Sequence, residues 1–230
     1  MQWEYASEER LAVRNAVYRE LLTAGESADD VAFDIVRELA PQRVLEVGGG
    51  MGEFAERLTR ELGIDVKAID LSLRMVELSR GRGVDAELGD VQQLPFGAAE
   101  FDCVVANWVL YHVPDLDRAL REIVRVLRPG GHLVAATVGV DNMRDVWELV
   151  GGPVSIERSF DARTGRDLLA AHFDTVTQRD VEGTLVFPDA AAVRHFVSMT
   201  MTRAHLASSV PELSEPLVTH SRHTIFVAHT

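Results

Sequence analysis

The chain is poor in cysteine and lacks any long apolar run. Its single cysteine, Cys103, cannot form an intramolecular disulfide and lies in an apolar segment, so we interpret it as core packing in a reducing compartment. No segment approaches the roughly 20 consecutive apolar residues that a membrane-spanning helix needs. The first ten residues also lack the basic and apolar regions of a signal peptide. We therefore expect a cytoplasmic globular protein.

Positive charge is scarce as well. The chain has 23 Lys and Arg residues against 36 Asp and Glu, a formal charge of −13, and Lys67 is the single lysine. A negative field repels phosphate backbones, and the arginines are scattered along the sequence, so nucleic acid is not expected as a partner. With 230 residues and 47% hydrophobic composition, the chain is long enough for one sizeable core. We expect one domain, as a monomer or homodimer, acting on a small molecule.

Glycine is concentrated in one short stretch, residues 44–54 (VLEVGGGMGEF). An apolar run ends in three consecutive glycines, a fourth follows at Gly52, and a helical pattern begins at Phe54, which predicts a strand, a tight turn and a helix start. Such loops usually bind dinucleotides through the pattern G-x-G-x-x-G, in which alanine can replace the last glycine. The alanine form of this pattern fits residues Gly50 to Ala55. A second interpretation reads E-x-G-x-G-x-G from Glu46 to Gly52. The loop alone leaves both interpretations open.

Acidic residues follow the next two predicted strands. Residues 66–70 predict a strand that ends at Asp70, twenty residues after Gly50, where a carboxylate can accept both ribose hydroxyls. Asp90 follows a short strand near residues 86–88. We expect Asp70 at an exposed strand end, with Asp90 beside it, because the carboxyl ends of parallel strands line the ligand-binding edge of a sheet.

The order of these signals over residues 44–138 resembles the class I S-adenosylmethionine-dependent methyltransferases, specifically the small-molecule type that includes ubiquinone and menaquinone biosynthesis enzymes. The segment GDVQQLPF at residues 89–96 matches that family's pattern, as does RVLRPGG at residues 125–131. In the second segment a helix is predicted to close at Pro-Gly-Gly, where the next strand starts. The resemblance implies S-adenosylmethionine as cofactor, S-adenosylhomocysteine as product and no metal. It also implies that Glu46 favours the methionine ammonium, Asp90 binds the adenine amino group and Asn107 offers its backbone carbonyl to the ammonium. The implied cofactor-binding residues are Glu46, Gly48, Gly50, Asp70, Leu71, Asp90, Val91 and Asn107.

The candidate catalytic residue is His112, which follows the predicted strand 101–107. An imidazole there can act as a general base toward a hydroxyl or ammonium nucleophile. His112 can equally serve only to pack against the reactants and position them, because a sulfonium is already reactive and alignment supplies much of the rate. Both roles stay open. The resemblance further implies an acceptor pocket, for which the candidate residues are Tyr18, Trp108, Tyr111, His195 and Met199, with Tyr5, Met201 and His205 nearby in sequence.

Alternating strands and helices predict an α/β fold with a doubly wound, mostly parallel sheet. We expect seven strands, Rossmann-like, with the last one, 223–229, antiparallel. A first helix is predicted to run to Leu22, and a second, capped by Ser27, to end before Pro41. Residues 1–40 are expected to cover the cofactor core, 44–138, and residues 141–159 and 189–222 to be acceptor-site insertions, with a helix over 189–207.

The expected function is methyl transfer to an oxygen, nitrogen or carbon of a small molecule in biosynthetic or secondary metabolism. One alternative is an NAD-dependent Rossmann oxidoreductase, because its cofactor uses the same loop and acid. Another is a non-catalytic subunit that binds S-adenosylmethionine. A metal site from His195 and His205 is not expected, because ten residues is not the spacing of two ligands on one helix face.

Overall fold

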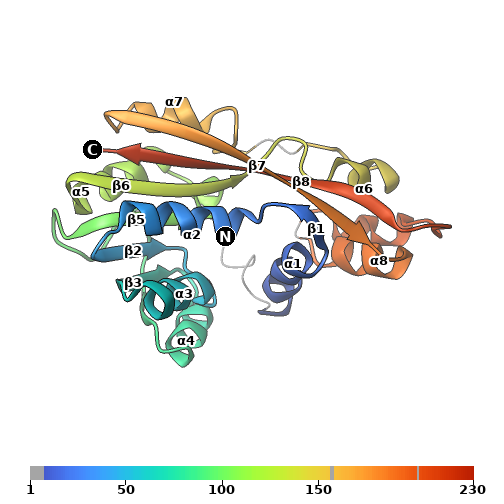
Figure 1. Cartoon of the computed structure of the whole chain (residues 1–230), viewed down its shortest axis with the longest axis horizontal. Helices are drawn as coiled ribbons and strands as arrows, with labels where there is room; N and C mark the ends of the chain where they lie inside the picture. The colour runs from blue at the N-terminus through green and yellow to red at the C-terminus, as the bar shows by residue number, and fades with distance from the viewer. Residues whose placement is uncertain (1–7, 156–157, 201) are drawn as a thin grey trace.

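The computed structural model describes residues 8–155, 158–200 and 202–230, and these form one mixed sheet of eight strands. The strand order is β1-β7-β8-β6-β5-β2-β3-β4 (Figure 1). Neighbours from β6 to β4 are parallel, whereas β8 is antiparallel to β6 and β7. The predicted α/β sheet with an antiparallel last strand is confirmed, but the described residues contain eight strands where seven were expected.

The parallel strands are short and almost wholly apolar, as strands covered on both faces should be. Alternate residues point to opposite faces, so Val44 packs on one side of the sheet and Leu45 on the other. Fully burying each such side chain contributes roughly 1.5–3 kcal/mol. The bounds are β2 (Arg43–Val47), β3 (Asp65–Asp70), β4 (Asp85–Leu88), β5 (Phe101–Asn107) and β6 (Leu127–Val138).

Helices cover both faces of this parallel half (Figure 1). One face packs against α2 (Ala28–Leu39), α3 (Glu53–Leu62) and α4 (Leu73–Gly81). The other packs against α5 (Leu116–Val126), α7 (Gly165–Ala170) and the 3-10 turn η1 (Leu110–His112). The double winding places the carboxyl ends of β2, β3 and β5 at one edge, where open α/β sheets bind ligands.

The antiparallel strands extend far beyond the parallel ones. They are β7 (Thr175–Phe187), β8 (Leu217–His229) and the short edge strand β1 (Leu22–Gly25). Against their far end pack α1 (Glu8–Glu20), α6 (Arg144–Leu149), α8 (Ala190–Ser198) and the 3-10 turn η2 (Ala204–Ser209) (Figure 1). These elements share a separate apolar cluster around Trp147, Phe187 and Phe196.

Four boundaries differ from the sequence predictions. The first helix ends at Glu20, and residues 22–25 pair with β7, which adds the eighth strand. The helix predicted to close at Pro-Gly-Gly ends at Val126, because the β6 strand already begins at Leu127. The last strand begins at Leu217 instead of residue 223, since it pairs with β7 along its whole length. The helix predicted over 189–207 divides into α8 and η2.

Candidate functional site

The glycine-rich loop turns from β2 into α3 through backbone conformations that favour glycine. Gly48, Gly50 and Gly52 have φ values of 69°, 53° and 79°, a region that side chains with a Cβ atom rarely adopt. The Gly48 N–H donates to the carbonyl oxygen of Ile69, which ties the loop to the end of β3. A Cβ atom on Gly52 would lie 2.3 Å from Ser79 Oγ. The glycines therefore fix both the turn and its packing against α4.

Asp70 ends β3 directly beside this loop. Its Oδ2 accepts from the Gly50 N–H at 3.0 Å and its Oδ1 from the Ser72 N–H at 2.8 Å. Only 6% of Asp70 is exposed, so the expected exposed strand end is wrong: the loop and the start of α4 fold over the carboxylate. Burial raises the Asp70 pKa, against the lowering effect of hydrogen bonds from three backbone N–H groups. Each oxygen retains further acceptor capacity for a ligand.

A cavity of about 670 Å³ opens above Asp70. This volume lies within the usual range for small-molecule sites. The cavity brings together six residues predicted from the sequence: Gly48, Asp70, Leu71, Asp90, Val91 and His112. We call it the cofactor cavity.

The rim of the cofactor cavity is apolar and exposed. Leu71, Leu73 and Leu88 are 53%, 58% and 57% exposed, and all three line the cavity. Exposed large apolar side chains that gather around a hollow are typical of a ligand-binding surface. Within the same cavity, Gln92 donates from its side-chain amide to both oxygens of Asp90, at 3.0 Å each, and so orients that carboxylate. Gln92 was not predicted from the sequence.

Glu46 and Asn107 lie at the ends of β2 and β5. Glu46 Oε2 and both amide atoms of Asn107 are buried, and no described residue offers them a hydrogen bond. Buried polar atoms without a hydrogen-bond partner are rare in proteins, so each one needs an explanation. Burial raises the Glu46 pKa to about 8, and Asp29 and Asp70 add to that rise. The two strand ends therefore present unsatisfied polar atoms, and a ligand cation placed there would favour the ionised form of Glu46.

A second, smaller cavity of about 80 Å³ lies against Trp108, the residue that follows β5. Trp108 has a φ of 61°, a strained conformation for a bulky residue. Its Nε1 donates to Asp29 Oδ1 at 3.1 Å. Tyr18 and His223 also line this cavity, which we call the acceptor cavity after the acceptor pocket that the sequence resemblance implies. The predicted pair of Tyr18 and Trp108 is thus brought together, while Asp29 and His223 were not predicted.

Asn142 positions the walls of the acceptor cavity. Its Nδ2 donates to the Tyr18 hydroxyl at 3.0 Å, its Oδ1 accepts from the Arg222 N–H, and its carbonyl oxygen accepts from Trp147 Nε1. The side chain and the backbone carbonyl of this one residue, on the loop after β6, thereby join α1, β8 and α6. This explains how elements distant in sequence hold the Tyr18 ring at the cavity.

The remaining predicted pocket residues lie elsewhere among the described residues. Tyr111 packs on the core next to His112, with ring centroids 4.4 Å apart, and carries Arg158 over its face. His195 is exposed on α8, and Met199 follows the end of that helix. Neither cavity has Tyr111, His195 or Met199 in its lining. Tyr5 and Met201 lie outside the described residues.

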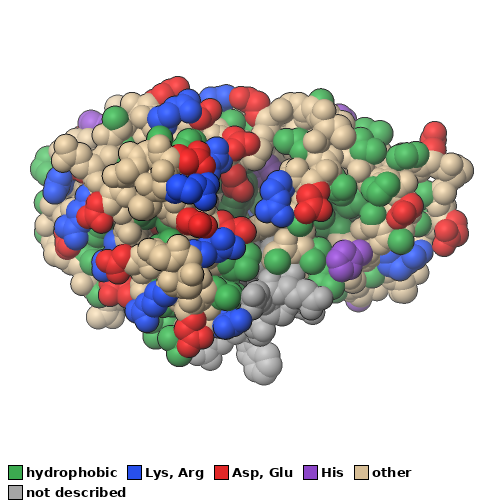
Figure 2. All heavy atoms as spheres, turned by 60° about the horizontal axis from the view of Figure 1, so that its bottom comes forward, with side chains coloured by type: hydrophobic (Ala, Val, Ile, Leu, Met, Phe, Trp, Pro, Cys, Tyr) green, Lys and Arg blue, Asp and Glu red, His purple; other side chains and the backbone are tan. Residues whose placement is uncertain are grey.

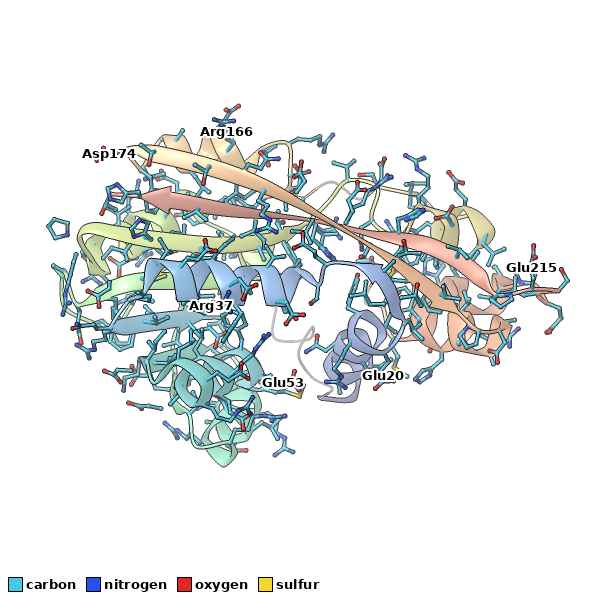
Figure 3. All side chains as sticks on the ribbon, viewed as in Figure 1. Glu20, Arg37, Glu53, Arg166, Asp174 and Glu215 are labelled. Atoms are coloured by element: carbon cyan, nitrogen blue, oxygen red, sulfur yellow. The ribbon has the colours of Figure 1, made fainter. Side chains whose placement is uncertain are left out.

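The dinucleotide alternative meets an electrostatic obstacle at α3. Pyrophosphate would rest on the N-terminus of this helix. Its first turn carries Glu53 and Glu56, and like charge there opposes an anion. Figure 3 shows Glu53 at the start of α3, on the side of α1, where it accepts a hydrogen bond from Asn15. The loop therefore suits a cofactor without phosphate.

Within residues 8–155, 158–200 and 202–230, no group of three or more His, Cys, Asp or Glu side chains is placed to hold a metal ion. In the same part of the chain, no helix is long and apolar enough to cross a bilayer.

Acidic and basic side chains are interspersed on the face shown in Figure 2. Arg57–Asp30 and Arg82–Glu56 are two of the described ion pairs.

Comparison with known proteins adds independent information. Residues 45–135 match a family described as "Methyltransferase domain". The chain is 35% identical to the methyltransferase GfsG of Streptomyces halstedii, over 54% of this chain and 48% of that protein. It is 32% identical to the malonyl-[acyl-carrier protein] O-methyltransferase of Erwinia pyrifoliae, over 73% of this chain and 65% of that protein. The matched region thus spans about half to two thirds of the length of these relatives.

The fold has a counterpart among solved structures. The crystal structure of the [4+2]-cyclase SpnF superposes with a TM-score of 0.64 and 23% identity, over 99% of this chain and 93% of the other. At that identity the likeness concerns the fold alone. A fold of this type therefore accompanies more than one named reaction, and the reaction has to be argued from the site.

Proposed function

We propose that this chain, which belongs to the class I S-adenosylmethionine-dependent methyltransferases, transfers a methyl group to an oxygen, nitrogen or carbon of a small molecule. The observation that carries the proposal is the cofactor cavity with its surroundings. Asp70 and Asp90 line one cavity after successive strands, and unpaired polar atoms of Glu46 and Asn107 lie at the adjoining strand ends. Hydroxyl, amino and cationic groups of one elongated ligand would satisfy all four residues.

The residues present fit S-adenosylmethionine. Asp70 would accept from the ribose hydroxyls, and Asp90, held by Gln92, from the adenine amino group. Leu71 and Val91 would pack on the adenine, and Gly48 and Gly50 would admit the ligand close to the backbone. Glu46 and Asn107 would pair with the methionine ammonium. When bound, the cofactor supplies a methyl group on a positively charged sulfonium.

The acceptor cavity is proposed to present the nucleophile. Trp108 lines the acceptor cavity and Val109, the next residue, lines the cofactor cavity. A molecule held against Trp108 and Tyr18 would therefore lie next to the reacting end of the cofactor, where alignment supplies much of the rate. We also propose that residues 141–159 and 189–222, with Tyr111, His195 and Met199, enclose larger acceptors. His112, in the cofactor cavity, would act mainly on cofactor position.

Calorimetry with S-adenosylmethionine, S-adenosylhomocysteine and NAD tests the cofactor. We expect both sulfur compounds to bind and NAD to bind far more weakly, because Glu53 and Glu56 oppose pyrophosphate. Tighter binding of NAD would refute the proposal. Turnover is then tested by screening uncharged, cationic and anionic acceptors for S-adenosylhomocysteine release. Cofactor binding without turnover on any of these would indicate the non-catalytic alternative.

A further inference from the structure

His223 is a buried polar side chain that the sequence analysis did not single out. It lies on β8, opposite Val138 of β6 and Val181 of β7, and lines the acceptor cavity. Its ring lies edge-on to Tyr18, at 5.0 Å between centroids, and to Trp108, at 4.8 Å. The residue is 6% exposed. No hydrogen bond joins either ring nitrogen of His223 to another described residue, and the ring lines the cavity.

The imidazole of His223 is uncharged. Burial lowers its pKa to about 3, because a buried imidazolium loses its hydration. A neutral imidazole has one N–H donor and one acceptor nitrogen. Such a pair at the wall of the cavity, beside two aromatic rings, suits a ligand that both accepts and donates a hydrogen bond, as a hydroxyl group does.

The charged residues around the acceptor cavity also limit the net charge that an acceptor can carry. Glu26 is paired with Arg179, at 2.8 and 3.0 Å, whereas Asp29 accepts only a neutral hydrogen bond, from Trp108. Among the described residues that line the cavity there is no Lys or Arg. Burial raises the pKa of Asp29, which shows that this site disfavours negative charge, and no lining cation would offset the charge of an anionic acceptor. The sulfonium of the proposed cofactor would repel a cationic acceptor. An uncharged acceptor meets neither obstacle.

We propose that His223 binds the acceptor, and that the acceptor presents a hydroxyl group on an uncharged planar ring that packs against Tyr18 and Trp108. This assignment rests on the proposed function, since it names the substrate class of the same site. Aromatic side chains bury large apolar rings favourably and in specific relative orientations. The cavity volume of about 80 Å³ suits the reacting ring alone, so the rest of a larger acceptor would lie outside the cavity.

Phenol, toluene and benzoate serve as probes for this proposal. They share one ring and differ in a hydroxyl, a methyl and a carboxylate group. Titrations of protein with 15N-labelled histidine rings, followed by NMR, report affinity and the His223 ring signals together. We expect phenol to bind roughly three- to tenfold tighter than toluene, the value of one neutral hydrogen bond, and to shift the ring nitrogens of His223. Benzoate should bind more weakly than either.

Two variants of His223 and one control complete the design. His223→Phe keeps an aromatic ring without nitrogens, so phenol should lose its advantage over toluene. His223→Gln keeps a donor and an acceptor and should retain part of it, which guards against a variant that fails to fold. His229→Phe is the matched control: His229 lies on the same strand, packs edge-on against His132 outside the cavity, and its replacement should leave phenol binding unchanged.

The outcomes separate this inference from the proposed function. Equal affinity for phenol and toluene in the wild-type protein, an unshifted His223 signal, or an unchanged preference in His223→Phe would overturn the role of His223. Tighter binding of benzoate would overturn the substrate class. Neither result bears on cofactor binding, which calorimetry measures without an acceptor. Conversely, failure to bind S-adenosylmethionine would refute the proposed function while leaving the phenol titration interpretable.

Discussion

Binding of S-adenosylmethionine should release close to one proton at pH 7, and Glu46 should be its source. The Glu46 pKa of about 8 means that roughly nine in ten molecules hold this proton at pH 7 before the ligand binds. A ligand cation near the buried carboxylate favours the ionised form and lowers the pKa. The proton must then leave. Affinity should accordingly rise about tenfold per pH unit from pH 6 to pH 7.5 and level off above the pKa.

Glu46 also makes the free protein less stable as the pH rises. The carboxyl ionises near 4.5 when unfolded and near 8 when folded, so between these values the folded state binds more protons. The contribution of Glu46 to stability is therefore most favourable below pH 4.5 and falls as the pH rises toward 8, with a loss of about 3 kcal/mol at pH 7. Glu46→Gln removes this ionisation. The variant should gain stability relative to wild type between pH 5 and pH 8.

Calorimetry in two buffers measures the released proton directly. Phosphate and Tris differ strongly in ionisation enthalpy, so the apparent binding enthalpy at pH 7 should differ between them in proportion to the protons released. Glu46→Gln should show the same enthalpy in both buffers and weaker binding. A wild-type enthalpy that is independent of the buffer, or a Glu46→Gln variant that still releases a proton, would refute the assignment.

Three other substitutions probe the cofactor cavity. Asp70→Ala should weaken cofactor binding at least tenfold, since it removes hydrogen bonds to a charged acceptor worth roughly 1.5–3 kcal/mol each. It should also lower the melting temperature, because the Gly50 N–H loses its acceptor. The control Asp85→Ala, at an exposed ion pair, should change neither quantity. Gly52→Ala should destabilise the protein in urea more than Gly63→Ala, since both have positive φ but nothing lies within 4 Å of a Cβ at Gly63. His112→Gln should raise the cofactor dissociation constant and leave the pH profile of turnover unchanged, since His112 lines the cofactor cavity; an altered profile with normal cofactor affinity would favour a general base.

Sequence patterns predicted the parallel half of the fold well. A short apolar run followed by glycine or an acidic residue predicts where a strand ends, and this signal depends only on neighbouring residues. These local signals are enough to assign Asp70 and Asp90 to one site, and both residues line the cofactor cavity. The burial of Asp70 was not predictable in this way, because it depends on how the glycine loop and the start of α4 fold over it.

The antiparallel end of the sheet was predicted less well, because its signals are not local. Strand β1 is mostly exposed and exists through its pairing with β7, more than 150 residues away in sequence. His223 was missed for a related reason. Thr219, Ser221 and His223 alternate as buried polar residues along β8, and this period of two would have indicated a polar cavity had the strand been extended back to residue 217.

The exposed leucine rim around the cofactor cavity bears on the heat capacity and handling of the protein. Leu71, Leu73 and Leu88 present apolar surface to water while the cavity is open, and a ligand that covers them removes that surface. Burial of apolar surface lowers the heat capacity, so binding there should become more exothermic as temperature rises. The ligand-free protein is correspondingly more prone to self-association than the liganded one. Purification with excess S-adenosylhomocysteine should therefore improve both its melting temperature and its solubility.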